Sequence, residues 1–378
     1  MDILHVLPSF DSGGLGSLAI ELIKAWPMGA QQVNHHAIAP NYPNQTKPVL
    51  RELFAAHCKT VAEVSRHTLA PNDYVNALQD RLTRIAPHPA TFGGVVAYNF
   101  IDAVWTAMGV HRAGYRKRIL QHVGTVLPNE QRFTGAVLSP YTEKMLFVPA
   151  SETVRKALIE IGTPPERLSE TVWNGVDLSL YQRPSTAGLE DPPFIRFGFT
   201  GRMAPGAKDW DALLKGFAEV RAVNPNARLI IAGDGPIKAQ ILEQAAELKL
   251  SVGMTDSAAG ETDVVMLGNL APPLVRAFLA SIDVFVMAAL PIEGMSMALV
   301  EAIAARKPIV ATDAPANVEV MRGLGFEAEQ LYSRTELGRG MQLAQDPIVR
   351  AAWINSARVA APKLNIDVTA QRYARHFQ

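Results

Sequence analysis

The sequence predicts an α/β protein made of two Rossmann-like domains, each with a doubly wound parallel sheet. Three observations lead to this fold class. Short apolar runs alternate with longer segments of helical period, the runs are apolar without interruption, and the whole pattern starts again after residue 182. Strands that are apolar on both faces and joined by helices are typical of parallel sheets covered on both sides. A chain of 378 residues is long enough for two such domains.

The first domain is expected over residues 1–182. Its strands are predicted at 3–7, 33–39, 95–98, 119–123, 137–138, 146–149 and 171–173, and its helices at 18–26, 73–86, 100–109 and 152–161. A stretch at 183–193, rich in proline and without a periodic face, reads as a linker.

The second domain is expected over residues 193–361. Its strands are predicted at 195–200, 228–232, 264–267, 284–287 and 308–311, and its helices at 209–223, 236–249 and 294–306. The last segment, 366–377, is amphipathic and reads as a further helix.

Composition excludes several classes of protein. The 36 basic and 36 acidic side chains give no net charge, which argues against a dedicated nucleic-acid binder. No apolar run reaches the ~18–20 residues that span a bilayer, and the first ten residues lack the basic flank of a signal peptide. Cys58 is the single cysteine, so an internal disulfide and a cysteine-based zinc site are excluded. We therefore expect a cytoplasmic protein.

Two doubly wound domains facing each other would form a cleft, with ligands at the carboxyl ends of the strands. The first predicted strand leads into a loop with Gly13, Gly14 and Gly16, whose amides could approach a phosphate or a sugar. A tight strand-to-helix turn without a ligand is the alternative, and the spacing is not the dinucleotide fingerprint. His122 ends the strand at 119–123 and would face the same cleft, unless it is a hydrogen-bonded core histidine.

Two cations follow the first strand of the second domain. Arg202 and Lys208 flank a Pro-Gly turn directly after that strand. Arginine offers a two-pronged donor and lysine a point charge, a pair suited to a diphosphate. A solvated loop with incidental charges is the alternative.

The strongest motif follows the strand at 284–287. Amides of Gly294, Met295 and Ser296 would open the predicted helix and point at an anion. Glu301 lies seven residues beyond Gly294, which places both on one face of the predicted helix. The Glu301 carboxylate could there accept hydrogen bonds from the hydroxyls of a ribose. Glu293, just outside the helix, could orient a second polyol. Two ordinary helix-associated acids are the alternative.

Two further turns have sufficient structural explanations. Asp234, followed by Gly235 and Pro236, reads as the acid that caps a helix with an early proline. Asn174 opens an Asn-Gly-Val-Asp sequence after a predicted strand, and a turn alone accounts for it.

Taken in order, these motifs resemble the family-4 glycosyltransferases, retaining enzymes of the GT-B fold. The resemblance covers most of the chain. It rests on the Gly-Gly-x-Gly loop, the strand-end histidine, Asn-Gly-Val-Asp, Gly-Arg followed by lysine, Ala-Gly-Asp-Gly-Pro, and two glutamates separated by seven residues.

The resemblance implies a nucleotide-diphosphate sugar as co-substrate, a UDP- or GDP-sugar, and a glycan or lipid-linked acceptor, without a metal or another cofactor. It also implies that a C-terminal helix at 362–378 packs back on the first domain. The implied site residues are His122 near the reacting carbon, Gly14, Arg202 and Lys208 at the diphosphate, Glu301 at the ribose, Glu293 at the transferred sugar, and Gly294, Met295, Ser296 and Met297 as an amide cradle.

The sequence departs from the family pattern in four places. Ala288 and Ala289 stand where a serine is common, and Asp209 replaces the glycine that usually follows the lysine. Arg306 occupies the place of a helix-ending glycine, which puts that cap in question. Trp173 replaces a proline.

Two other functions stay open on the same architecture: a nucleotide-sugar epimerase and a catalytically silent nucleotide-binding scaffold. The basic segment 111–118 leaves peripheral contact with the inner membrane face open, against the alternative of a solvated loop.

Overall fold

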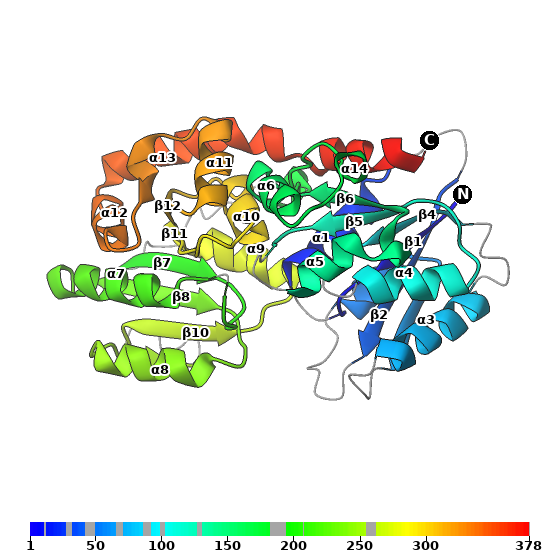
Figure 1. The fold of residues 1–378 in the computed structure, drawn as a ribbon. Coiled ribbons are helices and arrows are strands. Elements are labelled where there is room, and N and C mark those ends of the chain that lie inside the picture. Colours follow the sequence, from blue (N-terminus) through cyan, green and yellow to red (C-terminus); the bar gives the residue numbers. More distant parts are fainter. Residues whose placement is uncertain are drawn as a thin grey trace. The chain divides into compact units, whose positions relative to one another are not determined.

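The chain forms two compact units. The computed structural model describes residues 1–10, 13–27, 32–41, 50–65, 71–85, 92–98, 103–126, 131–181, 194–206, 208–254 and 262–377. Unit 1 comprises Met1–Gly175 together with Ile366–Gln378, and unit 2 comprises Val176–Asn365 (Figure 1). The division therefore precedes the predicted linker at 183–193, which lies outside the described residues.

Unit 1 is built on a six-stranded parallel sheet with the order β3-β2-β1-β4-β5-β6. The strands are β1 (Asp2–Val6), β2 (Asn34–Asn41), β3 (Thr60–Ser65), β4 (Phe92–Ala97), β5 (Ile119–Val123) and β6 (Met145–Pro149). The chain runs outward from β1 to β3 and then returns to β4 on the other side of β1. The order therefore reverses between β1 and β4, which is where open α/β sheets bind ligands.

Helices of unit 1 cover this sheet. They are α1 (Gly14–Lys24), α2 (Arg51–His57), α3 (Pro71–Ile85), α4 (Ala103–Arg112), α5 (Gln131–Leu138), α6 (Glu152–Glu160) and α14 (Ile366–Ala374). Large buried side chains such as Leu4, Phe92 and Phe147 form the core between the layers. The last helix, α14, packs against α1 in this unit.

Two strands predicted in this unit are wrong. Residues 137–138 belong to α5, because an apolar pair is too short to distinguish a strand from a helix. Residues 171–173 form no strand either: this extended segment is attached to the end of β6 by a single bond, from the Val172 amide to the Pro149 carbonyl at 2.9 Å.

Unit 2 is built on a seven-stranded parallel sheet with the order β13-β12-β11-β7-β8-β10-β9. The strands are β7 (Ile195–Thr200), β8 (Ala227–Ala232), β9 (Val252–Gly253), β10 (Val264–Gly268), β11 (Val284–Met287), β12 (Ile309–Thr312) and β13 (Leu331–Tyr332). Here too the order reverses next to the first strand, β7, so that the carboxyl ends of β7 and β11 mark the expected place for a ligand.

Helices of unit 2 enclose a second core. They are α7 (Trp210–Val223), α8 (Lys238–Glu247), α9 (Pro272–Ser281), α10 (Met297–Ala304), α11 (Pro315–Leu324), α12 (Leu337–Leu343) and α13 (Pro347–Ala360). Phe197, Phe199 and Phe217 are fully buried in this core. Among the helices of the described ranges, none combines the length and the apolarity needed to cross a bilayer.

Candidate functional site

The turn that carries Arg202 is fixed by the segment after β8. The Gly201 amide donates to the Ala232 carbonyl at 3.1 Å, and the Met203 amide donates to the Asp234 carbonyl at 2.9 Å. Arg202 lies between these two anchors and its side chain is exposed. Within the described part of the chain, its guanidinium has no hydrogen-bond or ion-pair partner, so all its donors remain available to a ligand.

Two glycines make this contact between backbones possible. Gly233 and Gly235 have φ angles of +150° and +154°, which L side chains rarely adopt. A Cβ atom would lie 2.0 Å from the Gly201 carbonyl oxygen at the first position and 2.3 Å from the Met203 carbonyl oxygen at the second. The Ala-Gly-Asp-Gly-Pro motif therefore positions the Arg202 turn by close backbone approach.

The prediction that Asp234 caps a helix is wrong. Helix α8 begins at Lys238, with Ile237 at the N-cap position. The Asp234 carboxylate instead accepts from the Gly235 amide at 2.8 Å and lies 3.5 Å from the Lys238 ammonium. The glycines on both sides keep this segment extended, so that the helix starts later than the Asp-Gly-Pro pattern suggests.

Lys208 joins the two predicted halves of the unit 2 site. Its ammonium donates to Glu293 Oε1 at 2.9 Å and to Ser296 Oγ at 3.0 Å. The side chains of Lys208 and Glu293 are only 10% and 13% exposed. An ammonium has three donors, so one N–H of Lys208 remains for a further acceptor. A Cβ at Gly201 would lie 3.2 Å from the lysine stem, so the glycine leaves room for it.

Helix α10 begins later than the sequence predicts. It starts at Met297 with Ser296 as the N-cap, so Gly294 and Met295 precede the helix, and Glu301 lies about one turn into it. Gly294 and Glu301 therefore do not share a helix face, and the prediction that they do is wrong. The glycine and the preceding proline turn keep this segment out of the helix, because both residue types disfavour helix interiors.

The Ser296 hydroxyl does not cap α10. A serine at the N-cap normally accepts from amides of the first turn. Here the hydroxyl bonds to Lys208, and no side chain of the N-cap satisfies those amides. The Val300 amide already bonds to the Ser296 carbonyl. The amides of Met297, Ala298 and Leu299 are therefore the helix donors at this end, and an anion there would also meet the positive end of the helix dipole.

The segment before α10 is anchored by a buried threonine. Thr312, at the end of β12, accepts from the Ala289 amide through Oγ1 at 2.9 Å, and the Asn317 side chain donates to the Thr312 carbonyl at 3.1 Å. The segment of Ala288 and Ala289, directly after β11, is therefore held in place by Thr312. No sequence motif pointed to Thr312 or Asn317, because both are ordinary residues of a strand end and a helix.

Glu301 is in contact with a residue that the sequence did not indicate. Tyr181 donates from its hydroxyl to Glu301 Oε1 at 3.3 Å. Tyr181 is the last residue of the short 3₁₀ turn Leu178–Tyr181. Asp177 precedes this turn, and its carboxylate accepts hydrogen bonds from the amide and the hydroxyl of Ser179 at 3.0 and 2.6 Å. The turn expected over residues 174–177 is therefore wrong: the turn follows the motif, at Leu178–Tyr181, and presents Tyr181 to Glu301.

Asp209 replaces the family's glycine for a structural reason. It is 3% exposed and is the N-cap of α7, accepting from the Ala212 amide at 3.1 Å. Arg334 donates to both of its oxygens at 2.9 Å. The departure at this position therefore stabilises α7 directly behind Lys208 and leaves the lysine ammonium in place.

In unit 1 the glycine loop opens α1. Gly13 is the N-cap in an extended conformation, and Gly14 and Gly16 form part of the first turn. Gly13 has no side chain to cap this helix, and no atom lies within 4 Å of the place where its Cβ would stand. The first amides of α1 therefore have no N-cap side chain as a partner.

His122 lies beside this helix start. It is 1% exposed on β5, and its Nδ1 lies 2.8 Å from the Tyr373 hydroxyl on α14. Its Nε2 has no hydrogen-bond partner in the described residues. A Cβ built on Gly124 would lie 3.6 Å from that Nε2 and 4.0 Å from Leu15 of α1. The structure therefore brings His122 and the glycine loop together, as a strand end and a helix start of one sheet.

Three other histidines of unit 1 form a buried cluster. His5 Nε2 lies 2.9 Å from His35 Nδ1, and His5 Nδ1 lies 3.0 Å from the Tyr98 hydroxyl. His36 is 3% exposed and lies 3.8 Å from Asp2. Desolvation by burial lowers the pKa of His5 and His36, and it lowers the pKa of His35 to about 4. These histidines are neutral core groups at neutral pH.

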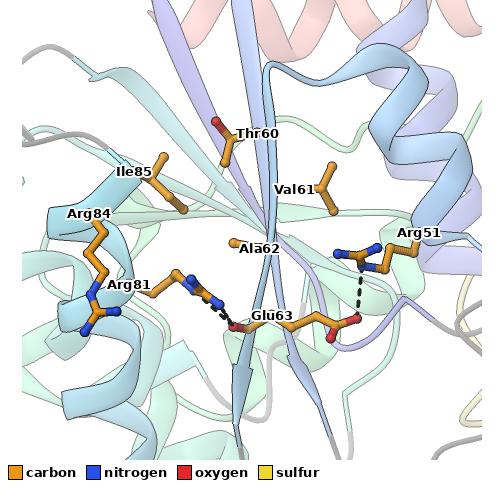
Figure 2. Close-up of a pocket in the computed structure, with 8 residues that line it drawn as sticks. All are labelled: Arg51, Thr60, Val61, Ala62, Glu63, Arg81, Arg84 and Ile85. Carbon is orange, nitrogen blue, oxygen red and sulfur yellow. Dashed lines mark hydrogen bonds and ion pairs between the residues drawn. The ribbon is translucent and has the colours of Figure 1, made fainter.

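A cavity of about 490 Å³ lies elsewhere in unit 1, at the edge strand β3 (Figure 2). Figure 2 shows Glu63 between Arg51 and Arg81. Arg51 lies 3.4 Å from the Glu63 carboxylate, Arg81 donates to the Glu63 carbonyl at 3.1 and 3.2 Å, and Arg84 pairs with Asp80 at 2.9 Å. Each cation is already paired, and Arg81 covers a backbone acceptor of the open sheet edge. The arrangement protects an edge strand.

Metal ligands do not gather in the described part of the chain. Across those residue ranges, no group of three His, Cys, Asp or Glu side chains is placed to hold a metal ion. The cationic groups of the candidate site are instead Arg202 and Lys208.

Comparison with known proteins relates the second half of the chain to one family. Residues 195–332 match the model of the family described as glycosyl transferases group 1. The chain is 28% identical over 218 residues to the GDP-mannose-dependent monoacylated alpha-(1-6)-phosphatidylinositol monomannoside mannosyltransferase of Corynebacterium glutamicum, covering 53% of this chain and 52% of the relative. It is 29% identical over 186 residues to the putative glycosyltransferase EpsF of Bacillus subtilis, covering 47% of this chain and 43% of the relative. The chain thus spans about half the length of the curated relatives it matches.

Solved structures show the same fold over the whole chain. HepE of Anabaena, in complex with UDP and glucose, superposes with a TM-score of 0.74 at 17% identity, covering 99% of this chain and 98% of that chain. A glycosyltransferase from Rickettsia africae gives a TM-score of 0.71 at 14% identity, covering 100% of this chain and 97% of that chain. Residues 195–332 therefore resemble the group 1 glycosyltransferases, and the chain as a whole has the GT-B fold.

Proposed function

We propose that this protein transfers a sugar from a nucleotide-diphosphate sugar to an acceptor hydroxyl in the synthesis of a glycan, glycolipid or cell-surface polysaccharide. In this reaction the bond between the sugar C1 and the β-phosphate oxygen breaks, and a bond between C1 and the acceptor oxygen forms. The acceptor gives up its hydroxyl proton, and a nucleoside diphosphate leaves. We propose retention of configuration at C1, as in the resembling family.

One observation carries this proposal. Lys208 is held 2.9 Å from Glu293 and 3.0 Å from Ser296, directly before a helix whose first amides have no side-chain cap. A cation and free helix amides at one place are suited to a phosphate, and an adjacent carboxylate is suited to sugar hydroxyls. The ion pair also holds both charged groups in place before a ligand arrives.

The proposed chemistry places positive charge where negative charge develops. As the C1–O bond breaks, charge accumulates on the leaving diphosphate, and fixed donors aimed at that charge lower the barrier. We assign this role to Arg202, Lys208 and the first amides of α10, without a metal ion. Glu301, held by Tyr181, is assigned to the ribose, and Glu293 to the transferred sugar.

The donor is proposed to be a UDP- or a GDP-sugar. The Corynebacterium glutamicum relative is named as GDP-mannose-dependent, and HepE was solved with UDP and with UDP-glucose. Both nucleotides share the diphosphate and the ribose, which are the parts that the assigned residues would contact. A screen of the two donor families is therefore the first experiment.

The test measures donor consumption with and without acceptors. The protein is incubated with UDP- and GDP-sugars, alone and with a panel of glycan and lipid-linked acceptors. We expect the nucleoside diphosphate to be released only when an acceptor is present. Arg202→Ala and Glu301→Ala should each weaken nucleotide binding, while Glu243→Ala on the exposed face of α8 should not.

Two results would contradict transfer. Conversion of the donor without any acceptor would indicate an epimerase. Tight nucleotide binding without turnover across the panel would indicate a nucleotide-binding scaffold.

A further inference from the structure

The His122 imidazole has two ring nitrogens in different surroundings. Nδ1 lies 2.8 Å from the Tyr373 hydroxyl. Nε2 is also buried, and it has no partner among the described residues. Buried polar atoms in native proteins are nearly always paired, so a ring nitrogen that no described residue satisfies makes His122 a candidate for contact with a ligand.

Tyr373 reaches His122 from a distant part of the sequence. It lies on α14, 251 residues beyond the histidine, and is 1% exposed. The helix is attached to unit 1 by Thr369, whose hydroxyl donates to the Trp173 carbonyl at 2.9 Å, and by Arg372, which donates to the Thr171 carbonyl at 3.1 Å. These bonds fix the phenol hydroxyl in front of Nδ1.

The chemistry of the two groups decides where the proton lies. Burial raises the pKa of the Tyr373 phenol and lowers the pKa of His122 to about 4, so both groups are neutral at neutral pH. In a neutral imidazole one nitrogen donates and the other accepts. A phenol O–H is a far stronger acid than an imidazole N–H, and the bare imidazole nitrogen is a better acceptor than a phenol oxygen. The favoured bond therefore runs from Tyr373 to Nδ1, which leaves the ring proton on Nε2.

The space in front of Nε2 is kept open by a glycine. Gly124 follows β5, and a Cβ there would stand 3.6 Å from Nε2 and 4.0 Å from Leu15. The position therefore has room for a small group at ordinary contact distance. A substrate oxygen that entered this space would lie next to Nε2 and the first turn of α1.

We propose that Tyr373 is a positioning residue that holds His122 in the tautomer with its proton on Nε2, so that this N–H donates to a hydroxyl oxygen of the sugar substrate. The proposal deepens the proposed function and rests on it for the identity of the substrate. The arrangement of the proton is a property of the protein alone and is measured separately.

Nitrogen-15 NMR of the histidine-labelled full chain tests the tautomer without any substrate. We expect His122 to show a protonated Nε2 and an unprotonated Nδ1 in the wild type. In Tyr373→Phe the two tautomers should mix, because the ring loses the bond that distinguishes them. Tyr115→Phe is the matched control: it removes another phenol hydroxyl of unit 1, which donates to the Arg118 carbonyl at 3.2 Å, and it should leave the His122 tautomer unchanged.

Kinetics supply the second measurement. Tyr373→Phe should lower kcat by about tenfold, the loss expected for one well-placed hydrogen bond. The Kd for UDP or GDP should stay unchanged, because these nucleotides lack the transferred sugar. Tyr115→Phe should leave kcat within about twofold, because its hydroxyl bonds to the Arg118 carbonyl and not to His122.

The two failures can be told apart. A wild-type His122 with its proton on Nδ1 overturns the inference, whatever the activity, and this result needs no folded variant. A correct tautomer with no change of kcat in a folded Tyr373→Phe also overturns it. Absence of sugar transfer by the wild type contradicts the proposed function and leaves the NMR result standing.

Discussion

At the scale of single residues, the site is built by pairing charges before a ligand arrives. The sequence predicted Arg202, Lys208, Glu293 and Ser296 as site residues, because each follows a strand end. In the structure, the Lys208 ammonium lies within hydrogen-bond distance of both Glu293 and Ser296. The sequence did not indicate Tyr181 or Tyr373. Both come from segments remote in sequence and carry no local motif, so that only the folded chain reveals their partners.

Lys208→Met should weaken binding of UDP or GDP by about 10- to 100-fold, because a charge-assisted hydrogen bond contributes about 1.5–3 kcal/mol. Isothermal titration with each nucleotide measures the effect. Lys215→Met is the matched control, since Lys215 is an exposed lysine of the same unit paired with Asp211 at 2.9 Å. Equal affinities of wild type and Lys208→Met would remove Lys208 from the diphosphate site.

Gly124→Ala should abolish most sugar transfer while preserving the fold. The methyl group would stand 3.6 Å from His122 Nε2, an ordinary contact for the protein but one that fills the approach to the ring. We expect kcat/KM to fall by at least about tenfold, the loss of one substrate hydrogen bond, with an unchanged melting temperature. Gly135→Ala is the comparison, because that position of the same unit has no atom within 4 Å of a Cβ. Full activity of Gly124→Ala would show that no substrate uses this approach.

At the scale of elements, helix α10 shows what sequence patterns can and cannot place. The strand before it was predicted at 284–287, as observed, because four buried apolar residues in a row indicate a central strand. Its start was predicted three residues early, because the sequence places Gly294 to Ser296 in the first turn of the helix, whereas they precede it. The helix ends in a left-handed cap, although the sequence has Arg306 where a glycine is usual. Arg306 has φ +55°, and the Lys307 amide donates to the Ala302 carbonyl at 3.0 Å.

Arg306→Gly should therefore stabilise unit 2 by up to about 1 kcal/mol. The left-handed conformation costs an L residue about 1–2 kcal/mol, and the larger entropy of glycine in the unfolded chain offsets part of the gain. Urea denaturation measures the change. Arg306→Ala keeps the strained conformation and should give no gain, which separates backbone strain from loss of the charged side chain. Equal stability of the glycine and alanine variants would rule out strain at this cap.

At the scale of the whole molecule, the sequence predicted two parallel α/β units from the restart of its pattern. It could not predict the order of the strands within each sheet, since order depends on long-range pairing. The histidines are distributed unequally between the units. All nine lie in segments assigned to unit 1, and residues 176–365 contain none. Burial lowers the pKa of several of them, and His35 and His122 reach about 4 from an ordinary 6.5.

Unit 1 should therefore lose stability between pH 6.5 and pH 4, while unit 2 stays nearly constant until carboxylates titrate. Between these pH values the histidines are protonated in the unfolded chain but not in the folded unit. The free energy of unfolding is therefore full above pH 6.5, and it decreases by about 1.4 kcal/mol for each such histidine with every pH unit below that. Hydrogen exchange read by mass spectrometry resolves the two units. His35→Gln should reduce the slope in unit 1, and a parallel loss of protection in both units would contradict the assignment.

The last helix has a consequence for how the chain is made. Residues 176–365 form unit 2 from one continuous stretch, whereas unit 1 needs both the beginning of the chain and the segment from Ile366 onward. Unit 1 therefore remains incomplete until α14 has been synthesised. Until then Gly94 lacks the Phe377 ring that packs on it and His122 lacks its phenol partner. The unit whose synthesis begins first is thus the last to have all its residues.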